Sequence, residues 1–319
     1  MEKEILLKAE SISKSFGGVK ALQNVSFELQ KGEVLSVIGE NGAGKSTLMK
    51  IVAGALKNDE GKIYFQGEEL SLHSPLDAVK TGISIVYQEP NIFADMSVLE
   101  NIFMGNETVS RGGTIQWTKM YDEAVEALRL VGLDGKILHL TMSELSIGNQ
   151  QLVLIARGIY KKCKVLILDE PTSILSHNES EKLFEIIADL KNKGVSIMYI
   201  SHRIPEILRI SDNIIVLRDG CLTGTLSPKE ISEETIITAM SGRKINMSVY
   251  KERKQSEKPI LEVKHLSLKP VYKDVSFDVR PGQILGMYGL VGAGRSEIAR
   301  AIFGETNAES GQIFLKERI

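Results

Sequence analysis

Short apolar runs that end in polar loops recur along the first two hundred residues. The runs EVLSVI (33–38), KVLILD (164–169) and SIMYIS (196–201) have the length of strands and are almost continuously hydrophobic. Strands of this kind lie in parallel sheets that are covered on both faces. The segments TLMKIVAG (47–54) and EKLFEIIADLKNKG (181–194) have helical spacing and end in glycine. The pattern predicts an α/β fold on a mostly parallel sheet, with ligands at the carboxyl ends of the strands.

One segment of the chain recurs at a constant shift of 250 residues. VSFELQKGEVLSVIGENGAGKS (25–46) matches VSFDVRPGQILGMYGLVGAGRS (275–296) without a gap. A repeat of this size indicates a tandem pair of domains rather than a solenoid. Between the copies, SGRKINMSVYKERKQSEKP (241–259) is polar, basic and poor in apolar residues, which is typical of a linker.

These features predict a first domain over residues 1–240, a linker over 241–259 and a second copy over 260–319. If the two copies had equal length, the second would need roughly 180 further residues. We therefore expect the second domain to be incomplete within this sequence.

The composition is that of an ordinary globular protein. Of the 319 residues, 43% are hydrophobic and 25% are charged, and the net charge is −2. There is no global basic field, so we expect no nucleic-acid partner. The longest apolar runs are far shorter than a membrane span, so a membrane role has to come through a partner protein.

The stretch GENGAGKST follows one predicted strand and opens a predicted helix. It fits the pattern G-x-x-x-x-G-K-[ST], whose glycines let backbone N–H groups turn toward phosphate oxygens at a helix N-terminus. Lys45 is expected to reach the β- and γ-phosphates, and Ser46 to hold Mg²⁺. The residues predicted to bind nucleotide here are Gly39, Asn41, Gly42, Ala43, Gly44, Lys45, Ser46 and Thr47.

Two carboxylates end the apolar run VLILDEP (165–171). Asp169 is placed to orient the Mg²⁺ shell, and Glu170 to polarise a water for in-line attack. An acidic pair alone could equally cap a sheet edge. The phosphate loop upstream favours the catalytic interpretation.

The motif LSIGNQQ (145–151) precedes the helical pattern QQLVLIARGIY and lies about 20 residues before the acidic strand end. In this order of motifs the chain resembles the ATP-binding cassette (ABC) proteins. The resemblance implies a P-loop NTPase-type fold with an antiparallel β subdomain and a helical signature subdomain, and it implies ATP and Mg²⁺ as ligands. It assigns catalytic roles to Glu170, His202 and Gln88, metal-binding roles to Ser46, Gln88 and Asp169, adenine stacking to Phe16, and completion of the facing domain's ATP site to Ser146 and Gly148. Alone, His202 would more often be a buried polar residue and Phe16 a core residue.

Three further segments are similar to the monosaccharide-importing branch of that family, of the ribose, galactose and xylose type. They are IVYQEPNIF (85–93), MSGRKI (240–245) and the second loop GLVGAGRSE (289–297). The resemblance implies a peripheral protein at the cytoplasmic face of the membrane, docked on permease subunits that an extracytoplasmic sugar-binding protein serves. It also implies that residues 89–105 contact the permease.

Two positions depart from the usual pattern. Ile147 stands where the family's signature has a glycine, and Arg295 stands where a phosphate loop has lysine. Arginine forks to two oxygens whereas lysine is a compact charge, so the two are not equivalent between phosphates. The resemblance implies that such a second loop belongs to a weaker composite site, which would be completed by the altered signature.

The sequence leaves three functions open. The first is an ATPase subunit that energises import of a sugar or sugar-like solute, with a second ABC domain or a homodimer completing its site. The alternative is a catalytically impaired nucleotide-binding remnant or regulatory module of a tandem ABC ATPase. A cassette ATPase of translation or DNA repair is the third, and the balanced charge argues against it.

Overall fold

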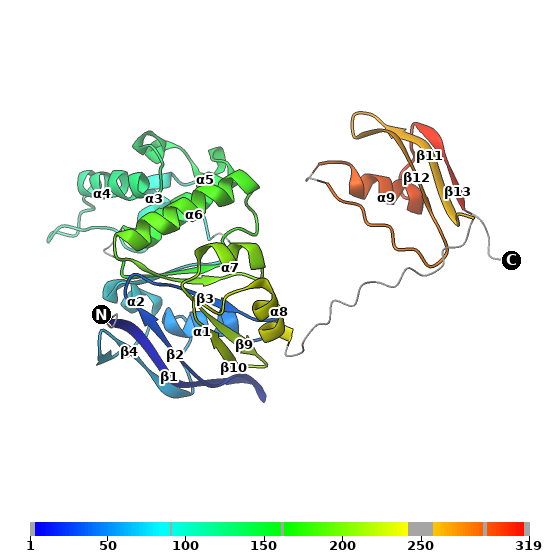
Figure 1. Ribbon diagram of the computed structural model, residues 1–319. Coiled ribbons are helices and arrows are strands. Elements are labelled where there is room, and N and C mark those ends of the chain that lie inside the picture. Colours follow the sequence, from blue (N-terminus) through cyan, green and yellow to red (C-terminus); the bar gives the residue numbers. More distant parts are fainter. Residues whose placement is uncertain (1–3, 90, 161–162, 242–257, 290–291, 316–319) are drawn as a thin grey trace. The chain divides into compact units, whose positions relative to one another are not determined.

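The structure, a computed structural model, describes residues 4–89, 91–160, 163–241, 258–289 and 292–315 (Figure 1). The chain divides into two compact units, Met1–Ile245 and Asn246–Ile319. The division falls within the predicted linker 241–259, of which residues 242–257 lie outside the described residues. The boundaries at 240 and 260 therefore stay predictions.

A six-stranded sheet is found among the described residues of the first unit, in the order β10-β9-β3-β8-β7-β6. Its neighbouring strands are parallel except for the antiparallel pair β9 and β10. The three strands predicted from the apolar runs are confirmed, and every residue in them is buried. The strands are β3 (Val34–Ile38), β6 (Ile83–Val86), β7 (Val165–Asp169), β8 (Ser196–Ile200), β9 (Asn213–Arg218) and β10 (Cys221–Leu226).

Both faces of this sheet are covered, as continuous apolar strands require. Along β7, Leu166 and Leu168 pack into a core with helices, while Val165 and Ile167 pack into a core with a second sheet. The helices on the first face are α3 (Val98–Phe103), α4 (Trp117–Leu130), α5 (Ile147–Ile159) and α6 (His177–Asn192), with the short 3₁₀ turns η1 (Gly135–His139) and η2 (Met142–Glu144).

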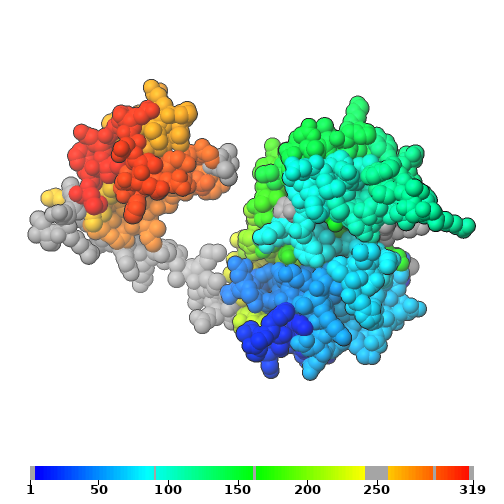
Figure 2. Space-filling model, turned by 180° about the vertical axis from the view of Figure 1, so that it is seen from behind, coloured from blue at the N-terminus to red at the C-terminus, as the bar shows by residue number. Residues whose placement is uncertain are grey.

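The second face carries α1 (Lys45–Val52) and an antiparallel sheet of order β2-β1-β4-β5. In Figure 2 the cyan-to-green residues of the helices form one lobe and the blue residues of this sheet form another. The antiparallel subdomain and the helical subdomain implied by the resemblance are thereby confirmed. The antiparallel sheet consists of β1 (Ile5–Phe16), β2 (Val19–Gln30), β4 (Glu60–Phe65) and β5 (Glu68–Glu69). The other helices among the described residues of this unit are α2 (Pro75–Thr81), α7 (Ile204–Ile210) and α8 (Glu233–Ser241).

Both predicted helices begin earlier than their apolar spacing indicated. Helix α1 starts at Lys45 rather than Thr47. Helix α6 starts at His177 rather than Glu181, because Ser176 and Glu179 form a capping box. Within the described part of the chain, no helix has the length and apolar composition that a membrane crossing requires.

The second unit contains a three-stranded sheet of order β12-β11-β13 and one helix among its described residues. Helix α9 and strand β13 stand 250 residues after α1 and β4, as the internal repeat predicts. Residues 284–288, the counterparts of β3, form no strand, and Ile284 and Tyr288 are 81% and 99% exposed. The elements are β11 (Leu261–Leu268), β12 (Tyr272–Val279), α9 (Arg295–Phe303) and β13 (Ser310–Leu315).

Candidate functional site

The phosphate loop connects β3 to α1, and two of its glycines are required by sterics. Gly39 has φ 155°, and a Cβ there would lie 2.2 Å from the Leu217 carbonyl oxygen. Gly44 has φ 99°, and a Cβ there would lie 2.5 Å from the Ala21 carbonyl oxygen. A side chain at either position would push the loop away from the strand ends.

Lys45 lies within this loop and is 7% exposed. Its ammonium donates hydrogen bonds to the carbonyl oxygens of Gly39 and Glu40, at 2.8 and 2.9 Å. Burial lowers the pKa of Lys45, while Glu170 and Asp169 oppose that shift. The Lys45 side chain thus lies between the loop and the acidic strand end.

Asp169 is the last residue of β7 and is buried. Burial raises the pKa of Asp169 and the neighbouring Glu170 raises it further, while the Ser46 hydroxyl and Lys45 oppose the shift. The structure therefore brings Asp169 to Ser46, and the metal ion that the two are expected to share stays a prediction.

The Glu170 side chain contacts residues from two other segments that are distant in sequence. Its carboxylate accepts a hydrogen bond from Gln88 Nε2 at 3.2 Å and lies 3.1 Å from His202 Nδ1. Its backbone is left-handed (φ 45°), and its N–H donates to the Ile200 carbonyl at 3.0 Å. Two of the predicted catalytic side chains, Gln88 and His202, therefore each contact the third, Glu170.

A cavity of about 280 Å³ lies between the phosphate loop and the side chains of Gln88 and Glu170, and neither His202 nor Asp169 lines it. It is lined by Ala21, Asn41, Gly42, Gly44, Lys45, Ser46, Thr47, Gln88 and Glu170. Phe16 does not line it, but it ends β1 in the same hairpin as Ala21 and is 47% exposed. An exposed aromatic ring can offer a face to a base.

The predicted signature residues lie elsewhere. Ser146 and Gly148, at the N-terminus of α5, line a separate cavity with Glu179 and not the cavity over the phosphate loop. A Cβ at Gly148 would lie 2.1 Å from Glu179 Oε1, so any larger residue here would require the Glu179 side chain to move. Ile147 is 55% exposed. The structure therefore does not bring Ser146 and Gly148 to the chain's own phosphate loop, and their role toward a facing domain stays a prediction.

The second loop opens α9 through Gly294, whose φ is 81°. Arg295 is half-buried, whereas its counterpart Lys45 is buried. Residues 290 and 291 of this loop lie outside the described residues.

Sequence reasoning missed two features around the site. One is a cavity beyond Gln88 that includes the half-buried Arg157, whose pKa burial lowers. The other is the buried carboxylate of Glu206, four residues after His202. For the cavity, the available signal was Arg157 within an apolar helical pattern. For the buried carboxylate, it was the position of Glu206 one helical turn after His202.

The family model described as ABC transporter matches residues 22–173 and 272–319. The chain belongs to this family. It is 43% identical over 312 residues to the ribose import ATP-binding protein RbsA of Caldanaerobacter subterraneus subsp. tengcongensis, covering 98% of this chain and 63% of that protein. It is 45% identical over 310 residues to a putative ribose/galactose/methyl galactoside import ATP-binding protein of Agrobacterium fabrum, covering 97% and 60%.

The chain therefore spans about three fifths of the length of these curated relatives. Among solved structures it is similar to the ADP conformation of MJ1267, an ATP-binding cassette of an ABC transporter, with a TM-score of 0.64 and 29% identity over 75% of this chain and 99% of that one. It is also similar to cbiO1 from Clostridium perfringens, with a TM-score of 0.63 and 27% identity over 76% and 96%. The resemblance seen in the motifs and the fold it implied are confirmed.

Proposed function

We propose that this ABC protein binds ATP with Mg²⁺ in its first unit and hydrolyses it, and that hydrolysis energises import of a sugar or sugar-like solute through a membrane permease. The observation that carries the proposal is the contact of Gln88, Glu170 and His202 beside the phosphate loop. The names of the relatives support the sugar as the solute.

Binding of the triphosphate follows from the loop. Backbone N–H groups of residues 39–47 and the N-terminus of α1 provide partial positive charge, and Lys45 adds a full one. The Lys45 ammonium is bonded to the loop carbonyls of Gly39 and Glu40, so it already lies at the loop that would hold the phosphates. Phe16 is proposed to stack on the adenine.

The residues also suit Mg²⁺. The Ser46 hydroxyl and the Asp169 carboxylate are hard oxygen donors that lie together, and Gln88 contributes an amide oxygen nearby. When bound, the ion supplies positive charge to the phosphate oxygens. Mg²⁺ commonly uses only one or two carboxylates together with substrate phosphates, so a single buried aspartate is sufficient.

Glu170 is proposed to orient and polarise the attacking water. It shares the cavity with Lys45, and its contacts with Gln88 and His202 hold the carboxylate in one orientation. Ser146 and Gly148 are proposed to complete the ATP site of a facing ABC domain, either a second domain or a second copy of the chain. The loop with Arg295 would form the weaker of two composite sites.

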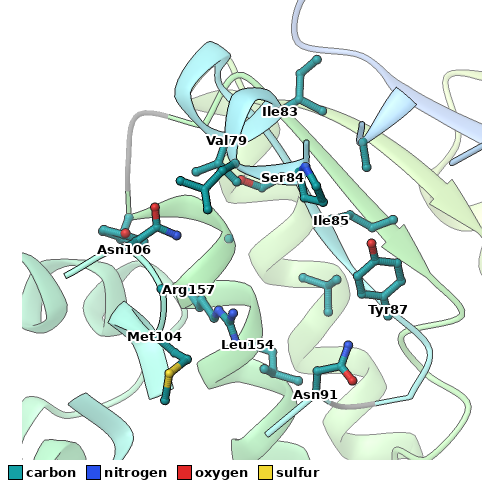
Figure 3. Close-up of a pocket in the computed structure, with 17 residues that line it drawn as sticks. Val79, Ile83, Ser84, Ile85, Tyr87, Asn91, Met104, Asn106, Leu154 and Arg157 are labelled. Atoms are coloured by element: carbon teal, nitrogen blue, oxygen red, sulfur yellow. The ribbon is translucent and has the colours of Figure 1, made fainter. Parts of the chain in front are cut away.

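The permease is proposed to dock on the cavity beyond Gln88. Figure 3 shows its walls: Val79 from α2, Ile83, Ser84 and Ile85 from β6, Leu154 and Arg157 from α5, and Met104 and Asn106. The cavity is lined both by the helical lobe and by β6, the strand that precedes Gln88. A partner bound there would therefore lie close to a residue of the proposed nucleotide site. Docking would place the chain at the cytoplasmic face of the membrane, with an extracytoplasmic sugar-binding protein acting through the permease.

Two observations favour a second candidate, a nucleotide-binding module with impaired turnover. Ile147 replaces the signature glycine, and Arg295 replaces the loop lysine. Both would affect the same composite site, while the cluster around Glu170 is intact.

The deciding experiment is ATP hydrolysis by the purified chain as a function of protein concentration, with Glu170→Gln as the control. We expect a rate that rises faster than linearly and is lost in the variant, because two copies must meet to complete a site. Binding of ATP without turnover at every concentration would support the module instead. Turnover that Glu170→Gln leaves unchanged would show that Glu170 is not the base.

A further inference from the structure

Glu206 is a buried carboxylate near the start of α7, 7% exposed, that receives donors from two segments, Thr172 and residues 199–203. The hydroxyl of Thr172 lies 2.8 and 2.9 Å from its two oxygens. Tyr199 donates at 2.9 Å, Ser201 at 3.0 Å, and the Arg203 guanidinium at 3.3 Å. A carboxylate is acceptor-only with about four lone-pair sites, so these contacts satisfy it.

The donors flank the proposed catalytic pair. Thr172 follows Glu170 by two residues, in the loop that leaves β7. Ser201 directly precedes His202, in the loop that leaves β8. Glu206 therefore joins the two loops whose side chains meet in the contact between Glu170 and His202.

Alternative arrangements of this network are costly. Thr172, Tyr199 and Ser201 are at most 2% exposed, so a hydroxyl that lost its acceptor would have no water to replace it. Burial raises the pKa of Tyr199 and the charge of Glu206 raises it further, so the phenol remains a donor. A fully satisfied buried network of this kind is rigid.

We propose that Glu206 is a positioning residue that fixes the loops after β7 and β8 in the register at which His202 Nδ1 reaches the Glu170 carboxylate. The inference rests on the proposed ATP hydrolysis. Glu206 itself does not line the cavity over the phosphate loop, so its effect reaches the reaction through the position of His202 against Glu170.

The test is Glu206→Gln, which replaces one acceptor oxygen by an NH₂ group facing the same donors. The matched control is Glu33→Gln, because Glu33 is also buried and hydrogen-bonded but precedes β3, at the opposite end of that strand from the phosphate loop. We expect Glu206→Gln to lower kcat about tenfold or more and to leave the KM for ATP within about twofold, since misplacement of a catalytic group affects the chemical step. Glu33→Gln should change neither.

A double-mutant cycle separates positioning from general weakening. If Glu206 acts through His202, Glu206→Gln should slow a His202→Ala enzyme by less than about twofold. The proposal would be overturned if the two losses in kcat multiplied in the double variant. It would also be overturned if Glu206→Gln alone kept the parental kcat.

A second readout does not require turnover. The chain has five histidines, and the ring NMR signals of His202 can be assigned by their loss in His202→Ala. We expect Glu206→Gln to shift the His202 signals and to leave those of His73 and His139 unchanged, and Glu33→Gln to shift none of the three. Unshifted His202 signals would overturn the positioning role. A wild-type chain that never hydrolyses ATP would contradict the proposed function alone, because the NMR comparison still decides the role of Glu206.

If Glu206→Gln does not fold, Tyr199→Phe removes one donor and keeps the ring. The His202 signals should then shift by a smaller amount. Their complete constancy in a folded Tyr199→Phe protein would count against the network.

Discussion

Glu170 shows how a single residue joins fold and proposed chemistry. It follows the last buried residue of β7, and its left-handed backbone turns the chain there. A non-glycine residue in this region costs on the order of 1–3 kcal/mol and persists where the surroundings determine it. The bond from its N–H to Ile200 and the network of Glu206 provide such surroundings. We infer that this left-handed backbone conformation directs the Glu170 carboxylate to Gln88 and His202.

Phe16 carries the first residue-level prediction. If its exposed ring stacks on adenine, Phe16→Ala should weaken ATP binding about tenfold, the loss expected for one aromatic contact. Phe16→Trp should retain most of the affinity because it keeps a flat aromatic face. Val19→Ala is the control, since Val19 is 70% exposed in the same hairpin. Titration with a fluorescent ATP analogue measures all three, and equal affinity of Phe16→Ala and the parent would refute the stacking role.

The site could be predicted in part from single residues. Lys45, Asp169 and Glu170 were identified because a glycine-rich loop and a strand end each have a distinctive pattern. Gln88 and His202 depended on resemblance, since nothing in a lone glutamine or histidine predicts that both reach one carboxylate. Glu206 could not be predicted because its donor Thr172 lies 34 residues away in sequence, and only the folded sheet brings the loops after β7 and β8 together.

At the scale of elements, apolar runs predicted the strands well and apolar spacing predicted helix starts poorly. The strands were correct because burial on both faces leaves an unbroken hydrophobic signal. Helix α6 begins four residues earlier than its spacing suggested because its first turn is polar. Its S-x-x-E motif, SHNE, was the available signal. The antiparallel sheet was expected only through resemblance, since half-exposed strands alternate and are harder to distinguish from loops.

Helix α3 provides the element-level prediction. Ser97 and Glu100 form its capping box, in which the Ser97 N–H and hydroxyl donate to Glu100 Oε2 at 2.8 and 2.6 Å. Glu100→Ala should lower the free energy of unfolding by about 1 kcal/mol at pH 7. Glu126→Ala is the matched control, because Glu126 is exposed on α4 and no hydrogen bond or ion pair of it is found among the described residues.

The effect of Glu100 should depend on pH in a defined direction. Hydrogen bonds from the Ser97 hydroxyl and then the Ser97 N–H lower the pKa of Glu100 below its ordinary value. The folded state therefore favours the ionised form of Glu100. Its contribution to the free energy of unfolding is complete above the ordinary pKa of a glutamate and is lost as pH falls through the lowered pKa of the folded state. Urea unfolding at pH 7 and near pH 3 tests this, and a difference between parent and Glu100→Ala that is undiminished at low pH would contradict it.

At the scale of the whole molecule, the internal repeat allows the two units to be compared with each other. In the first, the residues of β3 pair with β8 and β9 and are buried. In the second, residues 284–288 have the matching sequence ILGMY but form no strand. The difference arises because the pairing partners of β3 come from residues 196–200 and 213–218, far along the chain. The sequence could predict the repeat, but burial of a repeated segment depends on which distant strands accompany it.

This comparison gives a prediction for amide exchange. Backbone hydrogen bonds and burial set the protection of an amide, so residues 164–169 and 196–200 should exchange slowly. Residues 284–288 should exchange orders of magnitude faster despite their similarity to β3. Strand β11 is the internal control, because it pairs with two strands and contains the buried Val263 and Leu266. Mass spectrometry of deuterium uptake can rank the four segments, and slow exchange across 284–288 would show that this segment pairs in solution. Fast exchange there with a protected β11 would instead show that an apolar pattern alone does not make a strand.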